Sequence, residues 1–533
     1  MKRRLIILSL MFVLVLTACV GRLASIAIID GEKYKEIAKH QSTALLSGIT
    51  ARGNIYDRNG NYLTGMEECL IYILEKRKVD LKALSLLKDI DAQEINNSNE
   101  KYYVYSSSVL DKDAYEKLIG DYGAIVIKNR QRYSDNQPAI HVIGYVNHSD
   151  EVGACGIEKE YDSILSSVNR SYYGKFDGHG YLIRGLGVNI EGDSQEWGIV
   201  TTLDLTIQMA AEKILEEAKV SGAIIVTEAE TGNILASASS PAYSPRQLVK
   251  YLESSGEEFL NKSMICQYPP GSIFKIVVMA AALEEGIVTP ESSFVCNGYH
   301  EIKGHKFRCS TGGPEGHGEI SLKEAFSKSC NAVFIQLGEM VGAETILKYA
   351  RDFGILDTPV SGFSAQSAGN LPDIKDCLGT GIGNLSIGQG KLLITPAQVA
   401  RITRIIAKDG IDSKLSLISA TIEGLKGRVL YPKQLAKKVI SRKTAHAIKD
   451  MMVETVRSGT ADNLKLKDGV SAAGKTGSAE ATYHGKNTVH SWFTGFTPSD
   501  NPEYVITVFI ENGGSGRKSA VPIFNKMLDA IYH

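Results

Sequence analysis

A serine and a lysine stand three residues apart at Ser272 and Lys275, so both side chains share one face of a helix. An amine held beside a hydroxyl can take its proton and turn it into a nucleophile. Pro269-Pro270-Gly271 breaks any preceding element, and the mostly apolar run over 272–285 predicts a buried helix that stops at Gly286. The serine would lie in its first turn, where free backbone N–H groups favour negative charge. The pattern predicts a serine nucleophile whose base is a buried, neutral lysine.

Two further polar motifs follow in the chain, Ser329-Cys330-Asn331 and Lys475-Thr476-Gly477-Ser478. The first interrupts two stretches with helical composition. The second precedes aromatic and β-branched runs over 491–496 and 504–511, which are typical of strands in an antiparallel sheet. A Ser-x-Asn turn and a strand lysine would supply the remaining polar walls of an acyl-transfer site.

Two of the three motifs also occur where they carry no such meaning. Ser515-Gly-Arg-Lys518 repeats the serine–lysine spacing in a glycine-rich stretch where we expect no helix. Ser134-Asp135-Asn136 resembles the second motif but lies upstream of every candidate nucleophile. The ordered set of three motifs is therefore the informative signal.

Numerous collinear segments share one family resemblance: the chain resembles a class B penicillin-binding protein, a monofunctional peptidoglycan transpeptidase. The resemblance spans nearly the whole length. Outside the catalytic region it rests on the RGNIYDRNG segment (52–60), Gly156-Ile-Glu158 with Tyr161, and VTTLDLTIQ (200–208). Inside that region it rests on these segments: 231–245, YPPGSIFK (268–275), 317–331, 386–401, SGTA (458–461), AGKTGSAE (473–480) and 490–498.

The resemblance assigns a role to each motif residue. It implies that Ser272 is the nucleophile and Lys275 its general base, while Ser329 relays a proton to the leaving amine. Asn331 would bind the substrate amide, and Lys475 would tune the electrostatics. The backbone N–H groups of Ser272 and Ser478 would form the oxyanion hole. The terminal carboxylate of the substrate would bind Thr476 and Ser478, and a side chain at Gly477 would block the approach of the acyl chain.

Two segments depart from the family pattern. Ser244-Pro245-Arg246 stands where the family usually has Asp-Pro-Asn, and Lys262 follows Asn261 where Arg is common. Both lie outside the three motifs, so they bear on the substrate groove.

The family resemblance and the order of predicted strands and helices imply an α+β multidomain protein, and the length of the chain permits it. The 533 residues are 43% hydrophobic, which is enough for two or three domains that each have a hydrophobic core. The 59 basic and 60 acidic residues nearly cancel, so the net charge shows no basic excess of the kind that nucleic-acid binding needs. We expect a cytoplasmic tail and anchor over 1–29, a mixed α/β non-catalytic pedestal and dimerisation domain over 30–195, and a transpeptidase domain over 196–533. The last would be a penicillin-binding/β-lactamase-like fold with an antiparallel sheet flanked by helices.

The N-terminus predicts a single transmembrane helix. A basic Lys2-Arg3-Arg4 precedes an apolar run from Leu5 to Val20, which reaches spanning length if it continues to Ile29. The basic residues would stay in the cytoplasm, with all other domains on the extracytoplasmic side of the bacterial cytoplasmic membrane. A cleaved signal peptide and lipidation at Cys19 are the alternatives.

Eight cysteines are scattered along the chain, too few for a disulfide scaffold. Cys296 and Cys309 bracket a short loop, and outside the membrane they could form a disulfide. Free thiols are one alternative, and a zinc site with His305 or His317 is the other. We expect no metal in the catalytic site, and Cys330 to pack behind it without reacting.

The resemblance implies a membrane-anchored serine D,D-transpeptidase that needs no cofactor. Its substrates would be peptidoglycan stem peptides, and β-lactams would acylate the same serine. Its partners would be a polytopic lipid II polymerase and other cell-wall assembly proteins. A β-lactamase or D,D-carboxypeptidase, and a catalytically silent scaffold or antibiotic sensor, are the rival readings.

Overall fold

The computed structural model describes residues 2–31, 33–35, 43–45, 52–96, 101–147, 152–168, 170–177, 179, 181, 183, 188–192, 195–253, 256–483 and 485–532. The chain divides into two compact units. Unit 1 comprises residues 1–52, 67–131 and 168–195, and unit 2 comprises 53–66, 132–167 and 196–533. Residues 53–66 and 132–167, placed in the pedestal by the predicted boundaries, thus cluster with unit 2. The predicted boundaries themselves stay a prediction.

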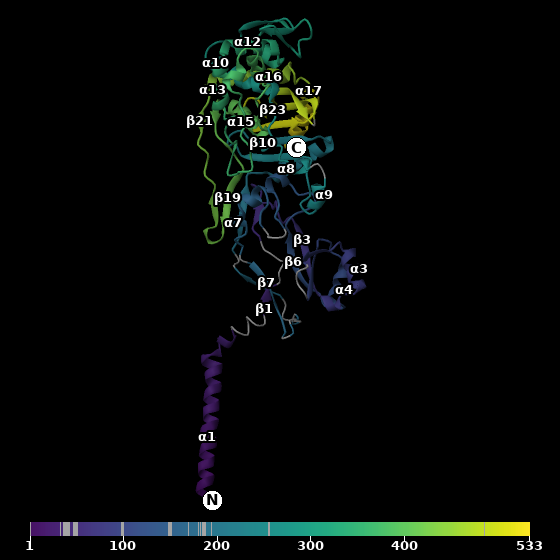
Figure 1. Cartoon of the computed structure of the whole chain (residues 1–533), viewed down its shortest axis with the longest axis vertical. Coiled ribbons are helices and arrows are strands. Elements are labelled where there is room, and N and C mark those ends of the chain that lie inside the picture. The colour runs from purple at the N-terminus through teal and green to yellow at the C-terminus, as the bar shows by residue number, and fades with distance from the viewer. Residues whose placement is uncertain are drawn as a thin grey trace. The chain divides into compact units, whose positions relative to one another are not determined.

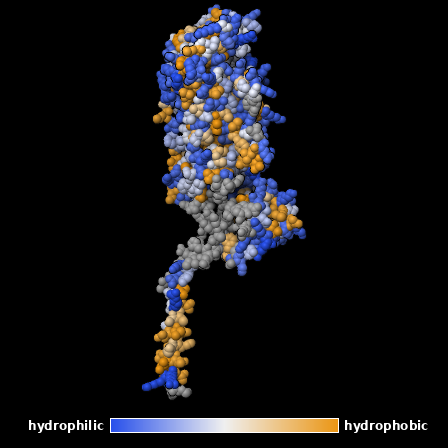
Figure 2. All heavy atoms as spheres, in the orientation of Figure 1, coloured by the Kyte–Doolittle hydropathy of each residue, from blue (hydrophilic) through white to orange (hydrophobic). Residues whose placement is uncertain are grey.

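An apolar helix opens unit 1. α1 (Lys2–Ala24) continues into the π-helix η1 (Ser25–Ile29) (Figure 1). The stretch Arg3–Ile28 is long and apolar enough to cross a membrane, and no other helix among the described residues is. Figure 2 shows it as a column of mostly hydrophobic residues with hydrophilic ones at the N-terminal end. Since none of its most apolar window is buried, α1 is a candidate membrane span.

The rest of unit 1 contains a four-stranded sheet in the order β4-β5-β3-β6. Leu70, Tyr72 and Leu74 of β3 pack on one face with Leu87 and Leu118 of the two helices that cover it. A three-stranded sheet has the order β1-β7-β8. The elements are β1 (Thr43–Leu45), β3 (Glu67–Glu75), η2 (Lys76–Lys78), α3 (Leu81–Asp89), β4 (Gln93–Asn96), β5 (Tyr102–Ser107), α4 (Lys112–Gly120), β6 (Ile125–Gln131), β7 (Arg170–Lys175) and β8 (Val188–Gly192).

Unit 2 is organised by a five-stranded antiparallel sheet in the order β11-β10-β24-β23-β22 (Figure 1). Its strands are β10 (Gly222–Glu228), β11 (Ile234–Ser240), β22 (Ala473–Tyr483), β23 (Lys486–Thr497) and β24 (Tyr504–Ile510). Their aromatic and β-branched residues favour this extended, half-buried surface. The arrangement confirms the predicted antiparallel sheet and places the lysine motif on β22, an outer strand.

Helices cover both faces of this sheet. Neighbouring side chains of a strand point to opposite faces, and here both faces carry apolar side chains that need a cover. Phe493 packs into a core with α8 (Leu205–Ala218) and α17 (Gly516–Ile531). Its neighbour Trp492 packs into the larger core with α10 (Lys275–Glu284), α15 (Pro396–Ala407) and α16 (Arg442–Arg457). The fold is thus the predicted sheet flanked by helices.

A second sheet of unit 2 has the order β2-β9-β19-β20. Its strands and the remaining elements of the unit are β2 (Asn54–Tyr56), α5 (Ile140–Ile143), α6 (Gly156–Glu160), α7 (Asp162–Leu165), β9 (Trp197–Thr201), α9 (Leu248–Leu252), η3 (Glu257–Phe259), η4 (Gly271–Phe274), β12 (Ser293–Cys296), β13 (Tyr299–Ile302), β14 (His305–Arg308), β15 (Gly318–Ser321), α11 (Leu322–Ser327), α12 (Asn331–Val341), α13 (Ala343–Asp352), β16 (Val360–Ser361), η5 (Ile374–Cys377), α14 (Gly381–Ser386), β17 (Ile411–Asp412), β18 (Leu415–Ser416), β19 (Ile418–Glu423), η6 (Gly424–Lys426), β20 (Arg428–Leu430) and β21 (Lys437–Lys438).

One local expectation was wrong. The stretch around Ser515 was expected to contain no helix, yet Ser515 is the N-cap of α17. Gly513 and Gly514 precede the cap and Gly516 is the first helical residue, while Val521, Phe524 and Leu528 downstream are buried at helical spacing against the sheet. The burial of apolar residues at helical spacing therefore stabilises a helix here, although its start is rich in glycine. Ser515 and Lys518 are exposed at the helix start.

Candidate active site

The predicted nucleophile lies in a short 3-10 turn that leads into a buried helix. η4 (Gly271–Phe274) contains Ser272, and α10 begins at Lys275. Gly271 has φ +54°, and a Cβ there would lie 2.6 Å from the carbonyl oxygen of Ser478. Glycine is therefore required at this position, because only glycine adopts this conformation at such close approach to β22. The Gly271 N–H donates to the carbonyl of Gly388 at 2.9 Å.

Lys275 joins the first two motifs in space. Its Nζ donates to the backbone oxygen of Ser329 at 2.8 Å and to Oδ1 of Asn331 at 2.8 Å, and lies 3.4 Å from Oγ of Ser329. The side chain is fully buried, and Nζ lies 5.1 Å from the ring centroid of Phe334. Burial lowers the pKa of Lys275 from its ordinary 10.5 to about 7, because the charged amine loses its water. The predicted burial of the lysine is confirmed, and its lowered pKa favours the neutral amine.

The second motif forms a tight turn between two helices. Ser329 follows α11 and has φ +56°, a conformation that residues other than glycine rarely adopt. Asn331 is the first residue of α12, and its Nδ2 donates to the backbone oxygen of Arg308 at 3.4 Å. The turn therefore presents Ser329 Oγ and Asn331 Oδ1 to the same amine.

The third motif lies on β22, beside the nucleophile turn. Lys475 is fully buried, with Nζ 3.2 Å from the carbonyl of Thr476 and 5.4 Å from the ring centroid of Phe326. Burial first, and the neighbouring charge of Lys275 second, lower the pKa of Lys475. Gly477 lies where a Cβ would come within 2.9 Å of side-chain atoms of both Ile273 and Trp492. The structure thus gives Gly477 a packing reason: it lets the nucleophile turn approach the strand.

Two hydroxyls of this strand have partners that the sequence did not reveal. Thr476 Oγ1 lies 2.5 Å from Oγ1 of Thr460, which belongs to the SGTA segment (458–461). Ser478 Oγ accepts from the backbone N–H of Gly516 at 3.2 Å, at the start of α17. Thr460 is an addition to the site, and the signal that could have found it was the family resemblance of its segment.

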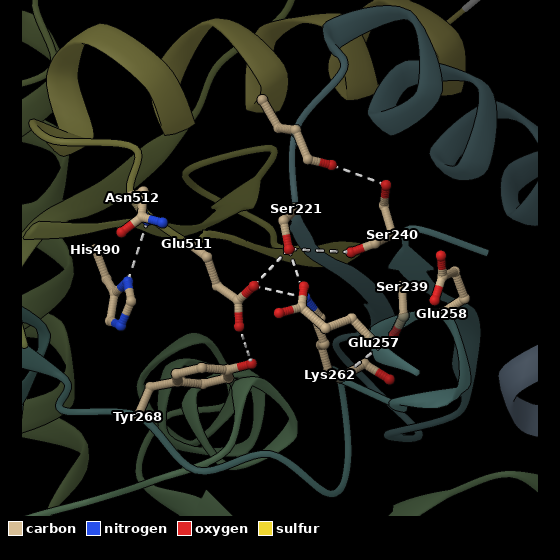
Figure 3. A network of polar contacts seen from close by, with 12 residues as sticks. Ser221, Ser239, Ser240, Glu257, Glu258, Lys262, Tyr268, His490, Glu511 and Asn512 are labelled. Atoms are coloured by element: carbon tan, nitrogen blue, oxygen red, sulfur yellow. Dashed lines mark hydrogen bonds and ion pairs between the residues drawn. The ribbon is translucent and has the colours of Figure 1, made fainter. Parts of the chain in front are cut away.

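A buried polar network adjoins the nucleophile turn, and its central members are drawn in Figure 3. Nζ of Lys262 forms an ion pair with Glu511 at 2.5 Å, and Tyr268 Oη donates to the other oxygen of Glu511 at 2.7 Å. Ser221 contacts both members of the ion pair. Lys262 is 1% exposed, so this departure from the family pattern lies in the interior and not in a substrate groove.

This network fixes the residues that lead into the nucleophile turn. The Tyr268 ring stacks on Phe509 with centroids 4.0 Å apart, and Trp492 Nε1 donates to the carbonyl of Pro269 at 3.1 Å. Burial opposes ionisation of Glu511, but hydrogen bonds from Lys262, Ser221 and Tyr268 outweigh it and lower the pKa of this carboxyl. Glu511 is therefore ionised at neutral pH. No local sequence pattern indicates this network, because Lys262 and Glu511 lie far apart in the chain.

The cysteines are all free thiols in the structure, so no bond joins Cys296 to Cys309, and their disulfide stays a prediction. The sulfurs of Cys296, Cys309 and Cys330 and a ring nitrogen of His317 lie within 4.8 Å of one another. We call these four residues the thiol–imidazole cluster. His305, the other histidine named above, instead packs edge-to-face against Phe307. The cluster has the donor types that bind zinc.

The geometry can therefore support one kind of chemistry above others. A serine on a 3-10 turn, a lysine with a lowered pKa and an outer strand lie in unit 2, and the hydrogen bonds of Lys275 Nζ go to Ser329 and Asn331. Such a set suits covalent acyl transfer through the serine.

Comparison with known proteins points the same way. A family model described as the penicillin-binding protein transpeptidase domain matches residues 222–529. The chain is 24% identical over 607 residues to the peptidoglycan D,D-transpeptidase MrdA of Haemophilus influenzae, covering 99% of this chain and 91% of MrdA.

Two solved structures have similar folds. One is a chain of a peptidoglycan synthase complex studied for the coordination of polymerization and crosslinking, with TM-score 0.74, 26% identity, and coverage of 99% of this chain and 98% of that one. The other is penicillin-binding protein A from M. tuberculosis as a ceftriaxone acyl-enzyme, with TM-score 0.63, 26% identity, and coverage of 76% and 93%.

Proposed function

The chain belongs to the penicillin-binding protein transpeptidase family, and we propose that it is a serine D,D-transpeptidase that cross-links peptidoglycan stem peptides. The observation that carries the proposal is the position of Lys275. Its amine contacts Ser329 and Asn331, and the helix that holds it begins directly after the turn with Ser272.

The lysine contacts suit a base. A neutral amine has two N–H donors and one lone pair. The two 2.8 Å contacts to Ser329 O and Asn331 Oδ1 use the donors, which leaves the lone pair to accept the proton of Ser272 Oγ. Ser272 Oγ then forms a bond to the penultimate D-Ala carbonyl carbon, and the N–H groups of Ser272 and Ser478 hold the oxyanion.

Expulsion of the terminal D-Ala completes acylation. The C–N bond breaks, and the proton on Lys275 passes through Ser329 Oγ, 3.4 Å away, to the leaving amine. The amine of a second stem peptide then attacks the ester, its proton returns by the same residues, and Ser272 Oγ is released. Asn331 would bind the substrate amide. Thr476 and Ser478 would bind the terminal carboxylate, and Lys475 would tune the electrostatics around it.

β-Lactams would acylate the same serine, as their ring amide presents a carbonyl to the same nucleophile. The acyl-enzyme form of the M. tuberculosis relative supports this expectation. α1 would anchor the chain in the cytoplasmic membrane with its basic end inside, which places unit 2 on the extracytoplasmic side. A polytopic lipid II polymerase and other cell-wall assembly proteins would be its partners, in line with the synthase complex that contains a similar chain.

A transfer assay with the full-length chain in detergent tests the proposal. Polymerised lipid II serves as donor and a labelled D-amino acid or stem peptide as acceptor, beside Ser272→Ala and Ser515→Ala. The second variant is a matched control because Ser515 has the same spacing to Lys518 but lies exposed at the start of α17. Label should enter the polymer with the wild type and Ser515→Ala, and not with Ser272→Ala.

Other outcomes decide between the rival readings. Release of D-Ala without label transfer would assign the chain as a D,D-carboxypeptidase. Rapid turnover of penicillin would assign it as a β-lactamase. A folded wild type that neither transfers, hydrolyses nor binds penicillin would overturn the enzyme assignment in favour of a scaffold.

A further inference from the structure

A side chain covers the outer edge of the strand that carries the third motif. β22 ends the five-stranded sheet, and β23 pairs with it on its inner side. The hydrogen-bonding pattern orients the Gln389 amide so that Nε2 donates to the carbonyl of Glu480 at 3.3 Å and Oε1 accepts from the Glu480 N–H at 3.2 Å. An amide that pairs with both backbone groups of one residue takes the position of a peptide unit in a neighbouring strand.

Gln389 belongs to the segment 386–401, a family-resemblance segment to which the proposed function assigns no role. The preceding Gly388 has φ +71°, and a Cβ there would lie 2.1 Å from the carbonyl oxygen of Gly271. The loop therefore passes against the nucleophile turn at a position that requires glycine. The Gln389 N–H donates to the carbonyl of Asn384 at 2.8 Å. These contacts fix the backbone of Gln389, so its side chain is the part that can move.

The covered position lies in line with the expected oxyanion N–H. In an extended strand, the N–H and C=O groups of every second residue point to the same edge. Glu480 follows Ser478 by two residues in a strand that pairs with β23 without a bulge, so the backbone groups of both residues face the same edge. Both residues are also exposed. An antiparallel peptide whose penultimate D-Ala pairs with Ser478 would bring the residue two positions earlier to Glu480, about 7 Å away.

The Gln389 amide and such a peptide would compete for the same backbone groups. The amide offers one donor and one acceptor, as a peptide unit does, so exchange of one for the other conserves the number of hydrogen bonds. The two distances to Glu480 lie at or beyond the long end of the usual range, and Gln389 is only half-buried. The amide therefore satisfies the outer edge of β22 through contacts that a peptide can replace.

We propose that Gln389 is a gate on the donor site: its amide occupies the backbone groups of Glu480 in the free enzyme, and a stem peptide long enough to reach Glu480 displaces it. This rests on the proposed function, because it takes the penultimate D-Ala carbonyl to lie at Ser478. Gln389 is then a specificity-determining residue that acts on the length of the donor, since a short acyl group does not reach Glu480. The apparent affinity for a long donor is reduced by the fraction of molecules in which the gate is open.

Two penicillins that differ in length test the gate on the full-length chain. One carries an acetyl group on the amine of the penicillin nucleus, and the other carries two further residues of a stem peptide on the same amine through an amide bond. The second-order rate constant of acylation is measured for each compound with the wild type, Gln389→Met and Gln389→Ala. Gln389→Met keeps the length of the side chain and removes the amide. Both variants should raise the long-to-short ratio about fivefold or more, through faster acylation by the long compound.

Gln434→Ala is the matched control, because Gln434 lies between β20 and β21, where its Nε2 donates to the carbonyl of Pro432. It should keep the wild-type ratio. A ratio that is unchanged or lowered in both Gln389 variants would overturn the gate. Equal slowing with both compounds would also overturn it, and would assign Gln389 to the support of the turn at Gly271.

The same measurement separates the gate from the proposed function. Acylation of Ser272 by both compounds with an unchanged ratio would remove the gate and leave the nucleophile in place. A folded wild type that neither compound acylates would overturn the proposed function and the gate together.

Discussion

The depressed pKa of Lys275 makes the reaction sensitive to pH in a defined direction. Burial lowers this pKa to about 7, and only the neutral amine can take the proton of Ser272. The rate constant of acylation by a β-lactam should therefore rise about tenfold per pH unit below about pH 7 and level off above it. Rapid-quench labelling of the full-length chain measures this profile. A flat profile across the same range would remove Lys275 from the role of base.

The same burial predicts a stability difference between the wild type and Lys275→Met. The folded pKa lies below the unfolded value of 10.5, so between about pH 7 and 10.5 the unfolded chain binds more protons. Wild-type stability should therefore rise with pH in this window, by up to about 1.4 kcal/mol per unit relative to Lys275→Met. Denaturant titrations at pH 7, 8 and 9 would compare the two, and parallel pH dependences would contradict a neutral lysine.

At this scale the sequence reveals residues whose neighbours are local or follow a known motif. Ser272 and Lys275 share one turn, and Asn331 is placed by its own motif. The partners of Lys262 and Cys330 lie at distant positions in the chain, so only the fold brings them together. Neither residue could be assigned its neighbours from spacing alone.

Among the elements, the nucleophile turn depends on the network behind it. Glu511→Gln removes the closer and more buried ion partner of Lys262, leaves only Glu257 at 3.8 Å, and weakens the hold on Tyr268. Loss of one member of a buried pair costs about 3 kcal/mol or more, so the free energy of unfolding should fall by that amount. Acylation should also slow, because Tyr268 leads into Pro269 and the turn.

Asp529→Asn is the control for this change, since Asp529 pairs with Lys467 at 3.0 Å with both side chains more than a third exposed. Its effect should stay within about 1 kcal/mol. Equal losses in both variants, measured by denaturant titration, would contradict a special role for the buried network.

The element pattern explains which parts of the fold the sequence predicted. The long apolar run predicts the helix α10, and the β-branched and aromatic runs predict the strands β23 and β24. These predictions succeed because the segments are buried along most of their length. α17 was missed at its start, where glycines mask the helical period that begins further on. The nucleophile segment begins as a 3-10 turn, and helix propensities do not distinguish such a turn from the first turn of an α-helix.

For the whole molecule, the testable feature is the role of α1 as a candidate membrane span. If α1 is an uncleaved span, Cys19→Ser should remain in the membrane fraction after alkaline carbonate extraction. Leu14→Arg should weaken retention, because it places a charge in the middle of the apolar stretch. Loss of membrane association in Cys19→Ser alone would favour lipidation instead. External protease should degrade unit 2 in spheroplasts if the basic end faces the cytoplasm.

The most direct measurement of the central claim is the identity of the acylated residue. Full-length wild type would be trapped with a β-lactam, digested, and analysed by mass spectrometry, beside Ser272→Ala. The account predicts one adduct on the peptide that contains Ser272, with none in the variant. An adduct on another serine, or none on a folded wild type, would contradict it.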